Sequence, residues 1–302
     1  MRRERGVAAI TAILIVAVAA SAATLMLAQQ SAMLDQTMLV ASRAQADMYA
    51  RAGLDWARGT ILADSNGSGA FDSLDEAWAQ PIAALPVERA VVSGVIVDEQ
   101  GKFNLNNLVV NGARSDADVK IFQRLLVSQG LAPELADAVV DWIDPDDAVS
   151  GAGAEDAYYL SLKRPYRAAN QAMTQVEELY RVRGFDAPTV AKLRPFVTAI
   201  AEHTAVNVNT AAEALLDAVL PEVPKEAIAQ FVKARRDAPL KSTGDLAKWA
   251  KTAIPEERAG VRSAYFSVIV RVAQDDVELA TDALISRAKP GPPAIIWRRP
   301  RY

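Results

Sequence analysis

A long uncharged apolar run near the amino end is the clearest hydrophobic pattern in the chain. Residues 7–27 carry no charged side chain and consist largely of Ala, Val, Ile and Leu. As an α-helix this run would be about 31 Å long, close to the roughly 30 Å hydrocarbon core of a bilayer. Arg2, Arg3 and Arg5 precede the run. Because cytoplasmic flanks are enriched in Lys and Arg, the pattern predicts one membrane span with the bulk of the chain exported.

The helical pattern continues beyond the apolar run. Neither Pro nor Gly occurs between Val7 and Ala52, and residues 28–62 keep helix-favouring side chains. The spacing predicts that the span and the exported segment after it form one continuous helix of about 50 residues, roughly 75 Å long. A mostly apolar stripe recurs in this segment at steps of three and four residues: Met33, Leu34, Met38, Ala41, Gln45, Met48 and Ala52.

An ordinary secretory signal is the alternative interpretation of the amino end. Ala20-Ser21-Ala22 would supply its small-residue cleavage site, and the mature chain would then begin near Ala23. The apolar run is long for such a signal, and the helical pattern does not stop where the run ends. We therefore favour an anchor that stays in the mature protein.

The exported part has strand patterns at both ends and helical patterns between them. A polar, Gly-containing break at 64–69 ends the long helix. Residues 90–97 are β-prone, and 98–101 indicate a hairpin turn into a strand at 102–105. Alternating or β-rich segments return near the carboxyl end, at 265–273, 277–287 and 294–298.

Helical spacing fills the middle of the chain. It predicts helices at 116–129, with Asp116 as a candidate cap, and at 133–143, 173–183 and 187–199. The simplest fold is α+β: an antiparallel sheet (63–108 and 263–302) with a large all-helical domain (109–262) inserted into it.

Composition narrows the function classes. The chain has 302 residues, no Cys, one His (His203) and a formal net charge of -4. Thiol chemistry and disulfides are thereby excluded, and a multi-histidine metal site or a histidine-based triad has too few ligands. The net charge argues against general nucleic-acid binding, which needs a basic face to displace counterions. No phosphate-binding Gly-rich loop stands out, so the sequence favours no enzyme class.

An acidic segment carries the clearest chemistry. Residues 141–156 hold six carboxylates together with Pro and Gly residues that bend the chain. Oxygen-rich sites of this kind suit Ca²⁺, which takes six to eight oxygen ligands with loose geometry. The spacing is not that of an EF-hand. From composition alone a solvated acidic loop is an equally good interpretation.

A helical hairpin near the carboxyl third suggests a second chemistry. Predicted helices at 211–219 and 225–235, followed by a third from Asp245, resemble a helix-hairpin-helix module (205–252) of membrane-anchored competence DNA receptors. Such hairpins bind phosphate through backbone N–H groups at a Gly-rich turn. Here the turn is Pro221-Glu222-Val223-Pro224, which lacks Gly and is acidic. The hairpin therefore favours a packing role over DNA binding.

The amino end resembles a type IV prepilin leader. Arg5-Gly6 stands directly before the apolar helix, so the resemblance implies a leader at 1–6 and cleavage by a prepilin peptidase between Gly6 and Val7. It also implies methylation of the mature chain. Most pilins have Glu at the fifth mature position, paired with a neighbour's amino terminus; here that residue is Thr11. Because a buried carboxylate needs a partner in the bilayer, its absence suggests a subunit with no neighbour above it.

The longest resemblance is to the K-type minor pseudopilins of the type II secretion system. Residues 141–173, 98–108 and 207–211 carry it, and it covers essentially the whole chain. It implies an inner-membrane, non-enzymatic subunit with a periplasmic bulk, which joins I- and J-type pseudopilins through its amino-terminal helix and caps the pseudopilus tip. It further implies a calcium site drawn from Asp141, Asp144, Asp146, Glu155, Asp156 and Asn170.

Two other classes stay open at this point. A membrane-tethered DNA receptor would show a basic surface and bind duplex DNA. A secreted calcium-dependent enzyme would lose its apolar segment on export.

Overall fold

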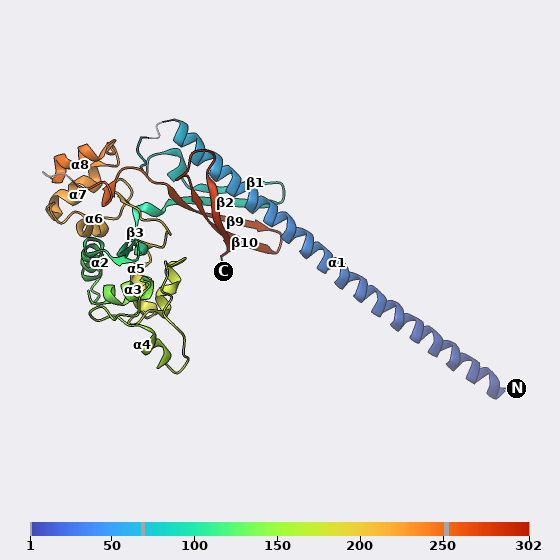
Figure 1. Cartoon of the computed structure of the whole chain (residues 1–302). Helices are drawn as coiled ribbons and strands as arrows, with labels where there is room; N and C mark the ends of the chain where they lie inside the picture. Colours follow the sequence, from blue (N-terminus) through green and yellow to red (C-terminus); the bar gives the residue numbers. More distant parts are fainter. Residues whose placement is uncertain (1, 68–69, 251–253, 302) are drawn as a thin grey trace.

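A computed structural model describes residues 2–67, 70–250 and 254–301. Its longest element is helix α1 (Arg2–Asn66) of 65 residues. The amino-terminal part of α1 projects alone, and its carboxyl-terminal part lies along a sheet (Figure 1). The predicted long helix is confirmed, and it ends at the predicted polar break.

A five-stranded antiparallel sheet forms the body of the protein, in the order β1-β2-β9-β10-β11. The predicted strands at both ends of the exported region therefore join one sheet. The prediction missed edge strand β1, which contains Pro86; an edge position tolerates a residue without an N–H donor. The strands are β1 (Ile82–Val87), β2 (Ala90–Asp98), β9 (Tyr265–Gln274), β10 (Val277–Ser286) and β11 (Ala294–Pro300).

Helix α1 packs on this sheet through a face of mostly small side chains. The buried residues recur at three- and four-residue steps and pack with β9 and β10: Ala46, Ala50, Leu54, Ala57 and Ile61. The predicted stripe lies elsewhere on the helix. Its large members, among them Met38 and Met48, are exposed. Alanines were the better guide to the sheet-facing side because they let the helix approach the strands closely.

The insertion is confirmed by the sheet order. Strands β2 and β9 are hydrogen-bonded neighbours although residues 99–264 lie between them in sequence. The inserted helices gather at the end of the sheet away from the free end of α1 (Figure 1). They are α2 (Asp116–Ser128), α3 (Leu135–Ile143), α4 (Asp156–Leu160), α5 (Ala187–Leu193), α6 (Glu213–Val219), α7 (Lys225–Ala234) and α8 (Thr243–Ala250).

Short elements complete the described part of the chain, and three strand pairs lie among the helices and loops of the insert. Each pair has two residues a strand: β3 (Phe103–Asn104) with β6 (Val197–Thr198), β4 (Val109–Val110) with β5 (Ala113–Arg114), and β7 (Val206–Asn207) with β8 (Ala259–Gly260). The 3-10 turns are η1 (Ala77–Ala79), η2 (Glu99–Gly101), η3 (Leu105–Leu108) and η4 (Val176–Arg181).

Several local predictions were wrong at the edges of the insert. Residues 98–101 form no hairpin turn: Asp98 caps η2, and β3 leaves the main sheet to pair in parallel with β6. Phe103 and Leu105 pack in the core of the insert, so the insert begins before the predicted residue 109. Ser115, and not Asp116, caps α2 by accepting from the Asp118 N–H.

Two predicted helices of the insert are shorter than expected. The segment 173–183 contains only the 3-10 turn η4, which a Gln175–Glu178 capping box closes. The segment 187–199 is helical as far as Leu193 and then enters strand β6. Pro195 lies two residues beyond the helix; it has no N–H to donate to the preceding turn and its ring would clash with that turn, so the helix does not continue.

Candidate functional site

The acidic segment links two helices of the insert. Asp144 is the carboxyl-terminal cap of α3, and Glu155 is the amino-terminal cap of α4. The ten-residue connection folds back, so that carboxylate oxygens of Asp144, Asp146 and Glu155 all lie within 4.8 Å of one another. Half of the predicted ligand set is therefore brought to one point.

Two of these carboxylates are buried, and three of their four oxygens lack a donor among the described residues. Glu155 is 2% exposed and Asp144 4% exposed, whereas Asp146 lies at the surface. Within the described part of the chain, both Glu155 oxygens and Asp144 Oδ1 accept no hydrogen bond. Unpartnered buried carboxylate oxygens are costly, so this cluster has an unmet need for positive charge or donors.

The pKa values of these carboxylates also indicate that the charged forms lack stabilising partners. Burial, with repulsion from Asp141 and Asp144 next in size, raises the pKa of Glu155 to about 7. Burial, followed by repulsion from Asp146 and Asp141, raises the pKa of Asp144 to about 6. A bound cation would reverse both shifts, because it favours the charged form of each carboxylate.

Asn170 completes the cluster from a distant segment. Its backbone N–H donates to the Trp142 carbonyl at 3.0 Å, and its side-chain Nδ2 donates to the Asp146 carbonyl at 3.4 Å. Its amide oxygen Oδ1 is buried and has no donor among the described residues. The residue adopts a φ of 45°, a left-handed conformation that Asn tolerates better than most residues. Asn170 therefore contacts the acidic segment at Asp146, and its amide oxygen is a further buried oxygen without a donor.

Asp141 lies next to the cluster, and its carboxylate accepts hydrogen bonds from the backbone of the loop between α3 and α4. It is fully buried, and both its carboxylate oxygens accept from the Ser150 N–H at 3.1 Å. Burial raises its pKa. A side chain at Gly153 would collide with the Asp141 carboxylate, so this close approach requires glycine.

Asp156 lies apart from the other predicted ligands. Its carboxylate pairs with Arg167 at 2.9 Å and accepts from the Ala168 N–H at 3.0 Å. Both oxygens are thus occupied by the segment that follows α4. Of the six predicted residues, the structure groups Asp144, Asp146, Glu155 and Asn170, places Asp141 as a neighbour, and directs Asp156 elsewhere.

The prediction missed Asp137. This residue accepts from the Ala152 N–H at 3.2 Å and pairs with Arg114 at 2.9 Å, so it anchors the other arm of the loop. The signal was available in the sequence: Asp137 precedes Asp141 by four residues and therefore shares its face of α3.

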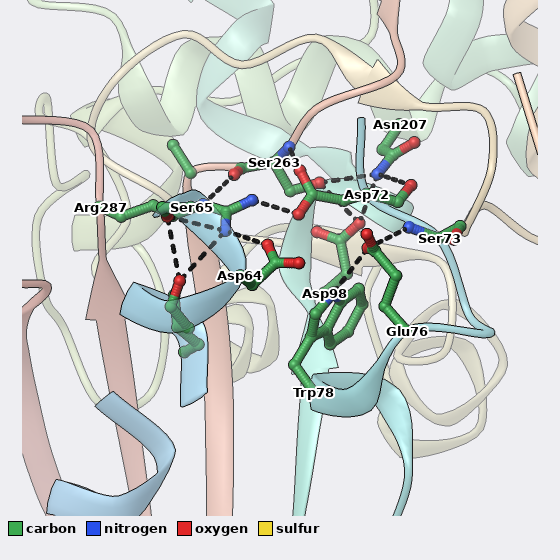
Figure 2. Close-up of polar contacts among 12 residues, drawn as sticks. Asp64, Ser65, Asp72, Ser73, Glu76, Trp78, Asp98, Asn207, Ser263 and Arg287 are labelled. Atoms are coloured by element: carbon green, nitrogen blue, oxygen red, sulfur yellow. Dashed lines mark hydrogen bonds and ion pairs between the residues drawn. The ribbon is translucent and has the colours of Figure 1, made fainter. Parts of the chain in front are cut away.

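A second group of three carboxylates is paired with an arginine side chain of the same chain. Carboxylate oxygens of Asp64, Asp72 and Glu76 lie within 4.8 Å of one another. Figure 2 shows the guanidinium of Arg287 between two of them: it pairs with Asp64 at 2.7 Å and also with Asp72. Burial raises the pKa of Asp72 to about 6, although Arg287 opposes the rise. An arginine thus fills the place that a metal ion would take.

The same network joins the insert to the body. Buried Asp98 at the end of β2 accepts from Asn207 at 3.0 Å and from Ser263 at 2.7 Å (Figure 2). Ser263 in turn donates its N–H to Asp72 at 2.7 Å. Both crossings of the chain between sheet and insert are therefore tied to the end of α1 through Asp72 and Arg287.

The helical hairpin has the features of a packing module. Leu215 and Leu216 of α6 and Phe231 of α7 are buried in the core of the insert. Glu222 in the turn pairs with Arg258 at 2.7 Å, so the turn presents a carboxylate where DNA phosphate would have to bind.

The amino-terminal helix has the length and apolarity of a single membrane anchor. Among the described residues it is the one helix that meets both conditions. Thr11 lies on its exposed surface. Gly6 and Val7 fall within α1, and nothing in the structure tests cleavage between them, so the predicted cleavage site stays a prediction.

A long helix laid on an antiparallel sheet, with an inserted helical domain that holds an acidic cluster, defines a pilin-like subunit of unusual bulk. The family model of type II secretion system protein K matches residues 101–202 and 206–268. The type II secretion system protein K of Pseudomonas aeruginosa is 35% identical, over 96% of this chain and 91% of that protein. That of Aeromonas hydrophila is also 35% identical, over 69% and 68%.

A solved structure has the same fold. In the crystal structure of the GspK-GspI-GspJ complex from the enterotoxigenic Escherichia coli type 2 secretion system, a chain matches with a TM-score of 0.76 at 22% identity. The match covers 88% of this chain and 99% of that one. The chain therefore belongs to the type II secretion system protein K family. It is a minor pseudopilin, as the sequence resemblance implied, and the DNA-receptor alternative finds no support.

Proposed function

We propose that the chain assembles with I- and J-type pseudopilins at the tip of the pseudopilus, as a structural subunit without catalytic activity. The solved relative belongs to a complex with such chains. The observation that carries the tip position is the insert: residues 99–264 stand at one end of the sheet, where another subunit would have to stack (Figure 1). Thr11 adds support, because it offers no carboxylate to a neighbour above.

The proposal includes a defined membrane topology. The arginines before the apolar run keep residues 1–6 on the cytoplasmic side of the inner membrane, and the sheet and insert lie in the periplasm. A prepilin peptidase then cuts between Gly6 and Val7, so that the apolar helix remains. Mass spectrometry of the purified protein tests this directly: a start at Val7 supports it, and a start near Ala23 contradicts it.

The acidic cluster binds calcium in this proposal. Asp144, Asp146, Glu155 and Asn170 offer hard oxygen atoms, and four of these atoms are buried without a donor in the described part of the chain. The cluster contains no sulfur or imidazole ligand that would favour a softer metal. The ion would fix the connection between α3 and α4, and would thereby keep the insert in one shape at the filament end.

Assembly is tested in cells that lack the resident subunit. Full-length protein should restore export of secreted proteins and co-purify with the I- and J-type chains from detergent extracts. A Thr11→Glu variant tests the tip position, because it supplies the acid of a shaft subunit. We expect it to enter the complex yet slow filament initiation. Unchanged initiation with full export would contradict the tip assignment.

A further inference from the structure

The inner face of the sheet is wider than α1 can cover. The helix packs chiefly on β9 and β10, where inward-facing Val268 and Val270 are buried. On edge strand β1 the inward-facing side chains stay open, and Leu85 is 53% exposed. An apolar groove of about 220 Å³ runs between α1 and β1–β2.

The groove is apolar and free of charge along its length. Helix α1 contributes Ala52, Gly53 and Trp56, and strand β1 contributes Ile82, Leu85 and Val87. Trp56 is 49% exposed at the rim. From there the exposed stripe of α1 continues toward the membrane through Met48 and Met38. Between the groove and Met38, Gln45 and Tyr49 hydrogen-bond the Glu88 carboxylate, so the groove is an exposed apolar patch with a polar rim. Patches of this kind mark interaction sites.

Resting on the proposed function, we infer that this groove receives the exported part of the long helix of a neighbouring I- or J-type pseudopilin. Spacing supports a helix as the occupant. Strands lie about 4.8 Å apart, so a helix centred over β1–β2 would lie about 10 Å from α1 centred over β9–β10. That separation is the usual distance between packed helices, about 8–10 Å.

An added strand fits this edge less well. Pro86 removes one backbone donor of β1, and the register shifts between Ile82 and Leu85. Both features interrupt the row of N–H and C=O groups that a new strand would need. Side-chain packing into the groove is unaffected by them.

Lipid and a second copy of the chain are excluded on physical grounds. The groove begins at Tyr49, about 33 Å along the helix from Leu27, so acyl chains do not reach it. A second copy anchored in the same membrane would present its own α1 at equal height. Arg51 and Asp55 on that surface are each 67% exposed, and an uncharged groove would have to desolvate them.

A matched pair of edge-strand variants tests the groove in the full-length chain. Leu85→Arg places a charge in it, while Ile296→Arg places one on the opposite edge strand at nearly the same exposure, 56%. With both partners co-expressed in membranes and extracted in detergent, we expect Leu85→Arg to weaken partner binding at least tenfold and Ile296→Arg less than twofold. Equal binding by both variants, with unchanged melting temperatures, overturns the inference.

The cysteine-free sequence permits a second readout that does not depend on a disruptive charge. A Leu85→Cys variant carries the chain's single thiol. We expect disulfides with cysteines placed along the exported helix of an I- or J-type partner, recurring at three- to four-residue steps. Crosslinks between two copies of this chain, or none to a partner helix, contradict the inference.

Met38→Arg separates this inference from the function on which it rests. Met38 lies on the α1 stripe, outside the groove, and is 64% exposed. If Met38→Arg abolishes partner binding and Leu85→Arg does not, helix-mediated assembly stands and the groove fails. If neither variant weakens binding, the partners stand but bind elsewhere on the chain. If the wild-type chain itself does not co-purify with the I- and J-type chains, the proposed partners fail.

Discussion

Removing one charge from the acidic cluster should stabilise the metal-free protein and destabilise the calcium-bound one. The change is Glu155→Gln, which keeps the shape of a side chain only 2% exposed and removes its titration. In the metal-free fold its carboxylate has two oxygens without donors, and its pKa rises to about 7 from an ordinary value of 4.5. An uncharged amide has no such cost.

The magnitude follows from the pKa difference. One unit corresponds to about 1.36 kcal/mol, so ionised Glu155 costs the metal-free fold about 3 kcal/mol. Because the folded pKa is raised, the protonated carboxyl contributes its stability fully below the unfolded pKa, near 4.5. That contribution is lost as the pH rises through about 7. Glu155→Gln should therefore resemble wild type at pH 4.5 and exceed it by about 3 kcal/mol at pH 8.

Calcium should reverse this order of stability, so that wild type becomes more stable than Glu155→Gln. At a thousandfold excess over its dissociation constant an ion stabilises the wild-type fold by about 4.1 kcal/mol, which exceeds the variant's advantage in the metal-free state, and the variant has lost a charged ligand. The assay is urea unfolding of the full-length chain in detergent at pH 4.5 and pH 8, with EDTA or with calcium. Asp156→Asn is the matched control, because Asp156 pairs with Arg167 outside the cluster. It should leave the calcium response unchanged.

The refuting result is specific. If Glu155→Gln destabilises the EDTA-treated protein at pH 8, the buried carboxylate is not an unmet charge and the reasoning fails. If EDTA and calcium give the same wild-type unfolding curve, the calcium site itself fails.

Three further substitutions test the junction between sheet and insert, the packing of α1 on the sheet, and the acidic loop. Arg287→Met should lower the free energy of unfolding in urea at pH 8 by about 3–5 kcal/mol, because it leaves buried Asp72 without its cation. Adding Asp72→Asn should restore most of that stability. Failure of the rescue would contradict the pairing. Leu54→Ala should cost about 2–5 kcal/mol in the same assay through the cavity left under α1, and a loss below 1 kcal/mol would show that the helix repacks. Gly153→Ala should weaken calcium affinity, measured by calorimetry, at least tenfold, because the added methyl group meets the Asp141 carboxylate that binds the loop. The control is Gly59→Ala, at a position on α1 with open space. It should leave calcium affinity unchanged and raise the free energy of unfolding by about 0.5–1 kcal/mol.

The long helix and the strands at both ends of the exported region were predictable because their signals are local. Absence of Pro and Gly from Val7 to Ala52 predicts one helix, and alternation at 265–273 predicts β9 with its buried face. Strand β1 gave little signal, because Pro86 and an open inner face remove the strict alternation. Its place in the sheet depends on pairing with β2, which no local pattern encodes.

In the candidate site, too, the features set by local sequence were predictable and the others were not. Residues close in sequence, Asp144, Asp146 and Glu155, were predicted as a group and are one. Asp156, next to Glu155, points elsewhere because the backbone changes direction between them: Glu155 is the extended N-cap of α4, and Asp156 is its first helical residue. Backbone direction at a helix start decides which of two neighbouring carboxylates joins the cluster, and composition carries no information on it.

The stripe on α1 shows why hydrophobicity alone could not assign the faces of the helix. Met38 and Met48 outrank Ala46 and Ala50 in apolar area, yet the alanines are buried and the methionines exposed. A helix on a twisted sheet gains contacts by close approach, which small side chains allow. The larger apolar surface remains uncovered within this chain. In a subunit that is folded before it is assembled, the more hydrophobic face is therefore the one that a neighbour is expected to bury.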